Sequence, residues 1–307
     1  MSDDVKRPRI RFYHSVDLDG HCSGAIFQLV AKKLGWQNTK LVGYNYGQDI
    51  DVEALKGAEV YFIDCTPQPV SQWAPKIAAV ADLFVIDHHV SAISDPAFKE
   101  FCTKGNSRVG TDAGCALAWE FWQDALGQMP EAVRLLSDYD AWNNKDKTYW
   151  EERVMPFQYG MKAFRTNPKD EDAVEVWGPL LNDKLKNSPL ILAVIERGET
   201  IYDWERTRLA KSAKPNAFEA EVFGKRAIVL NTCTKASQAF EAVFNPEKHD
   251  VMVAFTVVAR KDGRGLEYNV SFYATRPDVD CSMLAKRLGG GGHKGAAGCT
   301  VDQMVLS

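Results

Sequence analysis

The chain has 307 residues, 45% hydrophobic and 25% charged, which is typical of a globular protein long enough for two domains. Its net charge is −4, from 37 Lys and Arg against 41 Asp and Glu, which argues against the broad basic surface that binds long nucleic-acid duplexes. Seven scattered cysteines without a Cys-x-x-Cys motif argue against a disulfide framework or a thiolate zinc site and indicate a reducing compartment.

The first part of the chain alternates strand-like and helix-like patterns. Apolar residues at helical spacing cover 20–36, and a weaker helical pattern that contains Pro75 covers 70–81. This alternation predicts a mostly parallel sheet with helices on both faces. The predicted strands cover residues 9–16, 40–47, 59–66 and 83–90.

The pattern becomes helical from about residue 111 to residue 215. One predicted helix covers 111–126, with Thr111 and Asp112 as candidate caps, and a second covers 131–142. A long segment with apolar residues at helical spacing, 188–214, predicts a helix that connects two domains.

The sequence after Pro215 predicts a smaller α+β domain. Turn signals at Gly224 and at Asp262–Gly263 each lie between two apolar runs, as in hairpins. The predicted elements are two strands over 218–232, a hairpin over 251–276 and a helix over 279–288. We therefore expect an α/β catalytic domain over 1–190, a helical linker over 191–214 and a substrate-binding domain over 215–307.

Acidic and imidazole side chains follow three predicted strands of the first domain. Because the carboxyl ends of parallel strands meet at one edge of a sheet, we expect these side chains to converge there. A single Asp after a strand is usually a turn residue or a helix cap, but three strands that end this way favour a shared site. A further acid follows an apolar helical run, where Asp138 is favoured and Asp140 is kept as an alternative. The candidate ligands are His14, Asp17, Asp19, Asp64, His88 and Asp138.

These residue types predict a site for two divalent cations. Crowded carboxylates need cations to neutralise them, and two ions about 3.5–4 Å apart, bridged by one carboxylate, would do so. Imidazoles among the carboxylates favour Mn²⁺, with Mg²⁺ as the alternative. In an extended chain Asp17 and Asp19 would point the same way. His88 and His89 are adjacent and would point to different sides, so one can bind metal while the other faces substrate.

The C-terminal stretch "GGGGHKGAAG" (289–298) is the second unusual feature. It follows a helical pattern instead of a strand, and Lys294 precedes a glycine, so it is neither a dinucleotide fingerprint nor a P-loop. One interpretation is a flexible loop that ends a helix. The other is a nest of backbone N–H groups that binds a phosphate, with His293 and Lys294 adding charge and Arg276 as a partner.

Together these stretches resemble the DHH phosphoesterase superfamily, in the branch that carries a DHH-associated C-terminal domain. The matching stretches occur in the family's order: "DLDG" (17–20), "FID" (62–64), "DHH" (87–89), "LLSD" (135–138) and "GGGGHKGAAG" (289–298). In several relatives the first histidine lies two or four residues before the first Asp, whereas His14 lies three residues before Asp17. The glycine motif argues against the pyrophosphatase branch, and the length argues against the extra domains of RecJ.

The resemblance implies roles for individual residues. The candidate ligands would hold two metal ions, with Asp64 bridging them, and His89 would face the scissile phosphate. We assign Asp87 to the catalytic group in a supporting role, in which it orients the histidines. The implied substrate-binding residues of the second domain are Arg276, Gly290, Gly291, Gly292 and His293.

We therefore expect a two-metal-dependent phosphoesterase that degrades short single-stranded oligonucleotides from an end, with the second domain closing over the substrate. One alternative is a phosphatase or phosphodiesterase that acts on a small nucleotide, and another is a non-catalytic nucleotide-binding module. The partners that we expect are such an oligonucleotide or nucleotide, with a homodimer kept open.

We also expect a cytoplasmic location without a membrane partner. The N-terminus "MSDDVKRPRI" has no apolar signal core, and the longest apolar run, 251–259, is too short to span a bilayer.

Overall fold

A computed structural model of the chain describes residues 6–102, 105–233, 237–260, 263–274, 276 and 278–304. The chain forms two compact units, Met1–Tyr202 and Asp203–Ser307. The division between them falls inside the long helix α12 (Pro189–Asn216).

The N-terminal unit is built on a parallel five-stranded sheet, with strand order β2-β1-β3-β4-β5. This confirms the predicted α/β class with a mostly parallel sheet. The fifth strand was not predicted, because its three residues are too few to show a pattern. The strands are β1 (Arg9–His14), β2 (Thr39–Tyr44), β3 (Glu59–Ile63), β4 (Asp82–Asp87) and β5 (Ser107–Val109).

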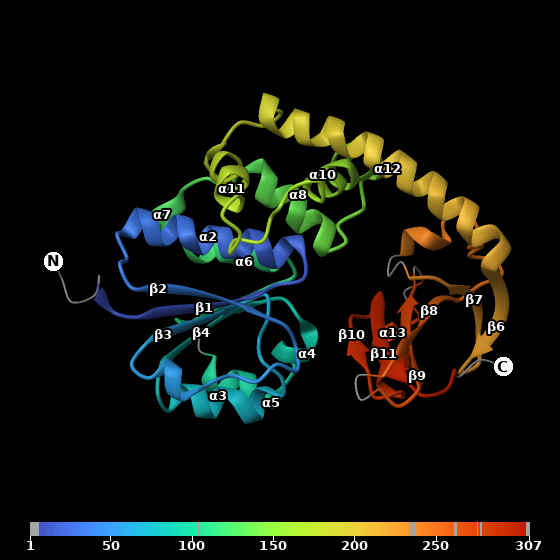
Figure 1. Ribbon diagram of the computed structural model, residues 1–307, viewed down its shortest axis with the longest axis horizontal. Helices are drawn as coiled ribbons and strands as arrows, with labels where there is room; N and C mark the ends of the chain where they lie inside the picture. The colour runs from blue at the N-terminus through green and yellow to red at the C-terminus, as the bar shows by residue number, and fades with distance from the viewer. Residues whose placement is uncertain are drawn as a thin grey trace. The chain divides into compact units, whose positions relative to one another are not determined.

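Helices cover both faces of this sheet, as Figure 1 shows. Strand β3 is buried along its whole length, and its side chains belong to two hydrophobic cores. Tyr61 and Ile63 pack into the core that includes α2 (Leu18–Leu34) and α6 (Gly114–Phe121), whereas Val60 and Phe62 pack into the core on the opposite face, with α3 (Val70–Ala78). Alternate side chains of a strand point to opposite faces, so a continuous apolar run is what a strand covered on both faces requires.

The helical part of the N-terminal unit differs from the prediction at one point. The helix expected over 111–126 is two helices, because α6 ends at Phe121 and α7 begins at Gln123, with Trp122 between them in a non-helical conformation. The remaining helices are α4 (Val90–Ile93), α5 (Pro96–Phe101), α7 (Gln123–Leu126), α8 (Glu131–Asp140), α9 (Lys147–Tyr149), η2 (Trp150–Val154), α10 (Met155–Met161) and α11 (Ala173–Asn182); a short 3₁₀ turn, η1, covers Glu53–Leu55.

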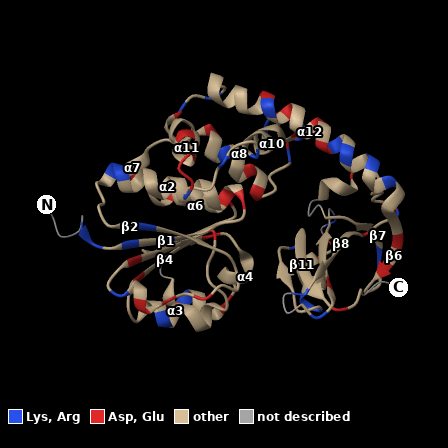
Figure 2. Cartoon of the chain, viewed as in Figure 1, with Lys and Arg blue, Asp and Glu red and all other residues tan. Residues whose placement is uncertain are grey.

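Helix α12 confirms the long helix predicted over 188–214, and glycines let its first half lie close to α10. A Cβ atom built on Gly198 would lie 1.7 Å from the carbonyl oxygen of Pro156, and one built on Gly160 would lie 2.0 Å from that of Val194. Glycine is therefore required at both positions by close backbone approach. Figure 2 shows residues of both charge signs along the helix.

Replacing Gly198 with alanine should destabilise the N-terminal unit. The added methyl group has no space beside Pro156, so we expect a loss of about 1–3 kcal/mol in the free energy of unfolding. Chemical denaturation monitored by circular dichroism measures this loss. The exposed Thr200 lies on the same helix, and Thr200→Ala should change stability by less than about 0.5 kcal/mol. Equal stability of the two variants would contradict the assigned packing.

The C-terminal unit is an α+β fold, as predicted. Its six-stranded sheet has the order β10-β11-β9-β8-β7-β6, in which β7 and β8 are parallel and the other neighbours antiparallel. Helix α13 (Cys281–Lys286) packs against this sheet through Leu284 and Ala285. The other elements are β6 (Ala217–Val222), β7 (Lys225–Asn231), η3 (Ser237–Phe240), β8 (Val251–Ala259), β9 (Leu266–Tyr273), β10 (Gly291–Gly292) and β11 (Ala296–Val301).

The predicted turns of this unit are found where the structure describes them. Phe223 and Gly224 both have positive φ angles, 50° and 76°, as a two-residue hairpin turn requires. Gly263 also has a positive φ, whereas Asp262 lies outside the described residues.

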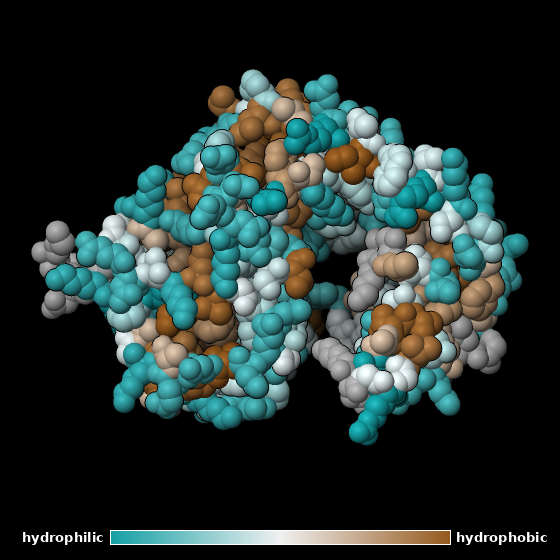
Figure 3. Space-filling model, viewed as in Figure 1, coloured by the Kyte–Doolittle hydropathy of each residue, from teal (hydrophilic) through white to brown (hydrophobic). Residues whose placement is uncertain are grey.

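Within the described part of the chain, no helix combines the length and the apolar character needed to cross a membrane. Hydrophilic and hydrophobic residues are interspersed over the visible face in Figure 3.

Candidate metal centre

The candidate ligands lie at the carboxyl edge of the parallel sheet. His14 is the last residue of β1, Asp64 directly follows β3, and His88 directly follows β4. These three strands are neighbours in the sheet, so the chain brings the three side chains to one edge. Asp17 lies just beyond β1 as the N-cap of α2, and its carboxylate accepts a hydrogen bond from the backbone N–H of Gly20 at 2.8 Å.

The cluster has two halves that meet at Asp64. On one side, Nδ1 of His14 lies 2.6 Å from Oδ2 of Asp17 and 3.7 Å from Oδ2 of Asp64. On the other side, Nε2 of His88 lies 3.2 Å from Oδ1 of Asp64 and 3.3 Å from Oδ2 of Asp140. Each oxygen of Asp64 thus faces a different half, which is the geometry that a carboxylate bridging two cations needs.

Asp19 belongs to the second half of the cluster, and its side chain also caps the N-terminus of helix α6. Its carboxylate accepts hydrogen bonds from the backbone N–H groups of Gly114 (2.8 Å) and Cys115 (2.7 Å), and Oδ2 lies 3.9 Å from Nε2 of His88. Two predictions are therefore wrong. Asp19 lies in the first turn of α2 and not in extended chain, because Asp17 already caps that helix, and α6 is capped by Asp19 and not by Thr111 or Asp112.

Asp64 is held in an unusual environment. The φ angle of Asp64 is 62°, and its side chain is buried. A Cβ atom built on Gly114 would lie 2.5 Å from the Cβ of Asp64, so only glycine leaves space for this side chain. Neither carboxylate oxygen accepts a hydrogen bond from any residue that the structure describes. Burial and the charges of Asp19 and Asp17 raise its pKa well above the ordinary value. A buried carboxylate among other carboxylates is costly unless a cation neutralises it, so these residues fit a metal site.

Asp87 does not face the cluster but holds the loop that follows β4. It is fully buried, and Oδ1 accepts hydrogen bonds from the backbone N–H groups of His88 (2.7 Å) and His89 (3.0 Å). Oδ2 accepts from the backbone N–H of Thr66 at 2.9 Å and from its hydroxyl group. This arrangement is what the supporting role predicted for Asp87 requires.

The two histidines differ in their electrostatic surroundings. Burial lowers the pKa of His88, which favours the neutral imidazole that a metal ligand needs. Burial also acts to lower the pKa of His89, but the Asp87 carboxylate, 2.7 Å from its Nδ1, outweighs this effect and raises the pKa to about 9. The Asp87 carboxylate therefore favours the protonated form of His89.

Asp140, and not Asp138, joins the cluster, which corrects the preference for Asp138. The Asp138 carboxylate accepts hydrogen bonds from Nδ2 of Asn143 (2.8 Å) and from the hydroxyl of Tyr149 (3.1 Å). Residues two apart in an α-helix point about 200° apart, so only one of the two acids of α8 can face His88. Asp140 was kept as an alternative because sequence alone does not give the rotation of the helix.

Tyr46 is a neighbour of the cluster that the sequence reasoning missed. Its ring centroid lies 5.7 Å from that of His14 and 5.7 Å from that of His89, and 36% of the residue is exposed. It lies two residues after β2, so its position beyond the carboxyl end of a strand was the available signal.

No protein-family model matches the sequence, and no curated protein matches it. Solved structures that resemble this fold include the DHH domain of a member of a family of ribosomal proteins, with TM-score 0.59 and 12% identity over 96% of this chain and 82% of that chain. An exopolyphosphatase-related protein from Bacteroides fragilis has TM-score 0.53 and 12% identity over 97% of this chain and 88% of that chain. The chain has the DHH-domain fold. This agrees with the family resemblance of its motifs.

Two backbone N–H groups of the glycine motif in the C-terminal unit of this DHH-fold protein are engaged within that unit, and substrate binding by Gly290, Gly291, Gly292 and His293 stays a prediction. The backbone N–H of Gly290 donates to the carbonyl of Ala285 (2.9 Å), and that of His293 donates to Ala296 (2.7 Å). A Cβ on Gly290 would lie 2.2 Å from the carbonyl oxygen of Gly298. Close packing on β11 therefore accounts for this glycine, and Gly291 and Gly292 form β10 beside β11.

The predicted substrate-binding arginine is engaged by acids of its own unit. Nη1 of Arg276 lies 2.9 Å from Asp250, and its Nε and Nη2 contact the Asp278 carboxylate at 3.0 and 2.9 Å. Its side chain remains 38% exposed, and a role for Arg276 in substrate binding stays a prediction.

The two acids of α8 provide a direct test of the metal centre. Asp140→Asn removes a charge beside His88, so Mn²⁺ affinity should fall at least about tenfold, equivalent to about 1.4 kcal/mol. Asp138 lies on the other side of the helix, so Asp138→Asn should change the Mn²⁺ affinity less than about twofold. Calorimetric titration of the EDTA-treated, dialysed protein with Mn²⁺ measures both affinities. If Asp138→Asn weakens binding more than Asp140→Asn, the assignment is wrong.

Proposed function

We propose that this protein is a metal-dependent phosphoesterase of the DHH superfamily that uses two divalent cations, with Mn²⁺ preferred over Mg²⁺. The observation that carries the proposal is Asp64, whose two oxygens face separate groups of ligands. The proposed ligands are His14, Asp17 and Asp64 in one group, and Asp64, Asp19, His88 and Asp140 in the other. When bound, the cations would supply Lewis-acid stabilisation of charge on the phosphoryl group.

The chain's own residues bind and orient the substrate in this proposal. Protonated His89 donates a hydrogen bond from Nε2 to a phosphoryl oxygen, while Asp87 fixes the ring through Nδ1. Tyr46 lies against the same imidazole and, being partly exposed, would contact the group attached to the phosphate. Burial raises the pKa of Tyr46, so its hydroxyl stays protonated and can donate as well.

The substrate that we favour is a short single-stranded oligonucleotide, cleaved from an end. An aromatic ring beside the phosphate site suits a base, since stacking tolerates every base. The net charge of −4 favours short substrates over long polymers, whose binding depends on many phosphate contacts. A small nucleotide would use the same features and is the second candidate. The seven cysteines are all free, which supports a cytoplasmic location.

A substrate panel with Mn²⁺ tests this function. Dinucleotides and longer oligonucleotides should be hydrolysed faster than a mononucleotide or inorganic polyphosphate, which is included because an exopolyphosphatase-related protein shares the fold. Asp64→Ala should reduce hydrolysis to background, while Asp138→Asn should retain it. Turnover that survives Asp64→Ala would overturn the metal mechanism, and preference for a mononucleotide would overturn the oligonucleotide assignment.

His89→Gln separates substrate activation from metal binding. Loss of the protonated imidazole should lower kcat by about 10²–10⁴-fold, because a positioned proton donor acts on the transition state. Mn²⁺ affinity should change less than tenfold, since His89 is not among the proposed ligands. Steady-state kinetics and calorimetry on the same preparation measure both. An unchanged kcat would exclude this role.

A further inference from the structure

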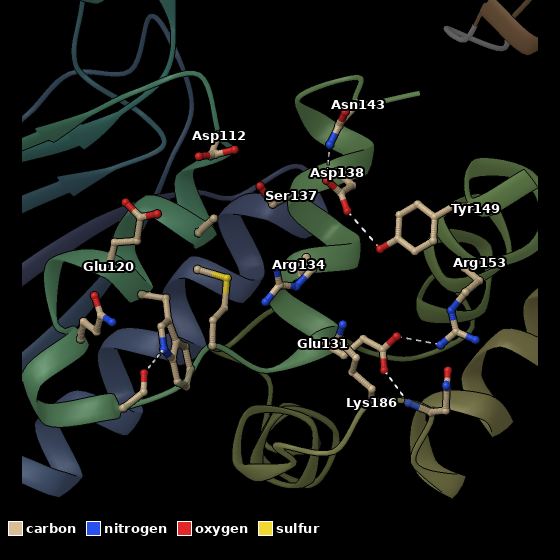
Figure 4. A pocket seen from close by; sticks show the side chains of 16 residues that line it. Asp112, Glu120, Glu131, Arg134, Ser137, Asp138, Asn143, Tyr149, Arg153 and Lys186 are labelled. Atoms are coloured by element: carbon tan, nitrogen blue, oxygen red, sulfur yellow. Dashed lines mark hydrogen bonds and ion pairs between the residues drawn. The ribbon is translucent and has the colours of Figure 1, made fainter. Parts of the chain in front are cut away.

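A cavity lies in the N-terminal unit, apart from the metal centre. It has a volume of about 800 Å³, within the range of small-molecule sites, and lies between α6, α8 and the segment that contains Tyr149 and Arg153 (Figure 4). None of the proposed metal ligands lines it. Nothing in the proposed hydrolysis uses this cavity.

Helix α8 separates the cavity from the metal centre. Glu131, Arg134 and Asp138 follow each other at intervals of three and four residues, so they share the helix face that lines the cavity. Asp140 lies on the opposite side, beside His88. A ligand in the cavity would therefore contact other residues than a substrate at the metal ions.

Most acids of the cavity already have partners. Glu120 is bound by Nε of Arg108 at 3.0 Å, and Oε1 of Glu131 by Nη2 of Arg153 at 2.7 Å. The second oxygen of Glu131 accepts the backbone N–H of Asn187 at 2.7 Å. The two arginines therefore neutralise the negative charges of Glu120 and Glu131 within the protein.

Two cations of the cavity are open to a ligand. Arg134 and Lys186 are exposed, and the side chain of neither forms a hydrogen bond or an ion pair with another residue in the described ranges. Asp112 is a further acid of the lining, but it lies at the far end of the view from Lys186 in Figure 4. Asp138 of α8 also lines the cavity and keeps its charge, because its hydrogen-bond partners, Asn143 and Tyr149, are neutral. Near α8 the two cations therefore exceed this one acid by a single positive charge.

We propose that this cavity binds a small phosphate-bearing molecule, with Arg134 and Lys186 holding the phosphate. The planar guanidinium matches two phosphate oxygens at once, and the lysine adds a point charge. The remaining volume accommodates an organic group, for which the half-buried Met129 of the lining offers an apolar surface. The phosphate can come from a nucleotide or from free inorganic phosphate.

Calorimetric titration of the full-length protein in EDTA tests the proposal, because chelation removes binding that depends on metal ions. AMP, inorganic phosphate and adenosine are the probes. We expect AMP, inorganic phosphate or both to bind and adenosine not to bind; tighter binding of AMP assigns the site to nucleotides, and equal binding assigns it to phosphate itself.

Variants link that binding to the cavity. Arg134→Ala and Lys186→Ala should each weaken it at least tenfold, whereas Lys145→Ala, an exposed lysine outside the cavity, should leave it unchanged. No binding in EDTA, adenosine binding as tightly as AMP, or equal affinity in all three variants would overturn the proposal. Since no metal is present, these results do not depend on whether the protein hydrolyses phosphoesters.

Discussion

The carboxylate of Asp64 is buried among other acids with no hydrogen-bond donor in the described residues to compensate it. The fold is arranged around this constraint. Strand β3 delivers the residue, its left-handed backbone turns it into the cluster, and Gly114 leaves the space that its side chain needs. Asp19 then ties the N-terminus of α6 to the same point. Helices α2 and α6 and strand β3 thus meet where cations would relieve the repulsion.

The parallel sheet and the edge where the acids gather were predictable because both depend on local patterns. Apolar runs gave four of the five strands, and a polar residue after a buried strand must lie at the sheet's end. His14, Asp64 and His88 lie at neighbouring strands for this reason. The adjacent histidines were expected to point to different sides, but both rings lie beside Oδ1 of Asp64, at 3.2 Å for Nε2 of His88 and 3.7 Å for Nδ1 of His89. The contact of the His89 ring with Asp87 accounts for the higher pKa of His89.

The sequence does not determine properties that depend on the rotation of a helix or on the packing between elements. Asp138 and Asp140 are both compatible with the apolar run before them, and only the packing of α8 selects Asp140. Asp19 was misplaced because α2 starts earlier than its apolar pattern. The glycines near residue 290 have two physical explanations, open backbone donors or close packing, and the contact of Gly290 with Gly298 identifies packing there.

The central claim is that two cations share Asp64, and anomalous diffraction from crystals grown with Mn²⁺ tests it most directly. The account predicts two manganese peaks about 3.5–4 Å apart, one beside His14 and Asp17, the other beside His88 and Asp140, with Asp64 between them. A single peak that does not touch Asp64, or no peak at this edge of the sheet at saturating Mn²⁺, would contradict it.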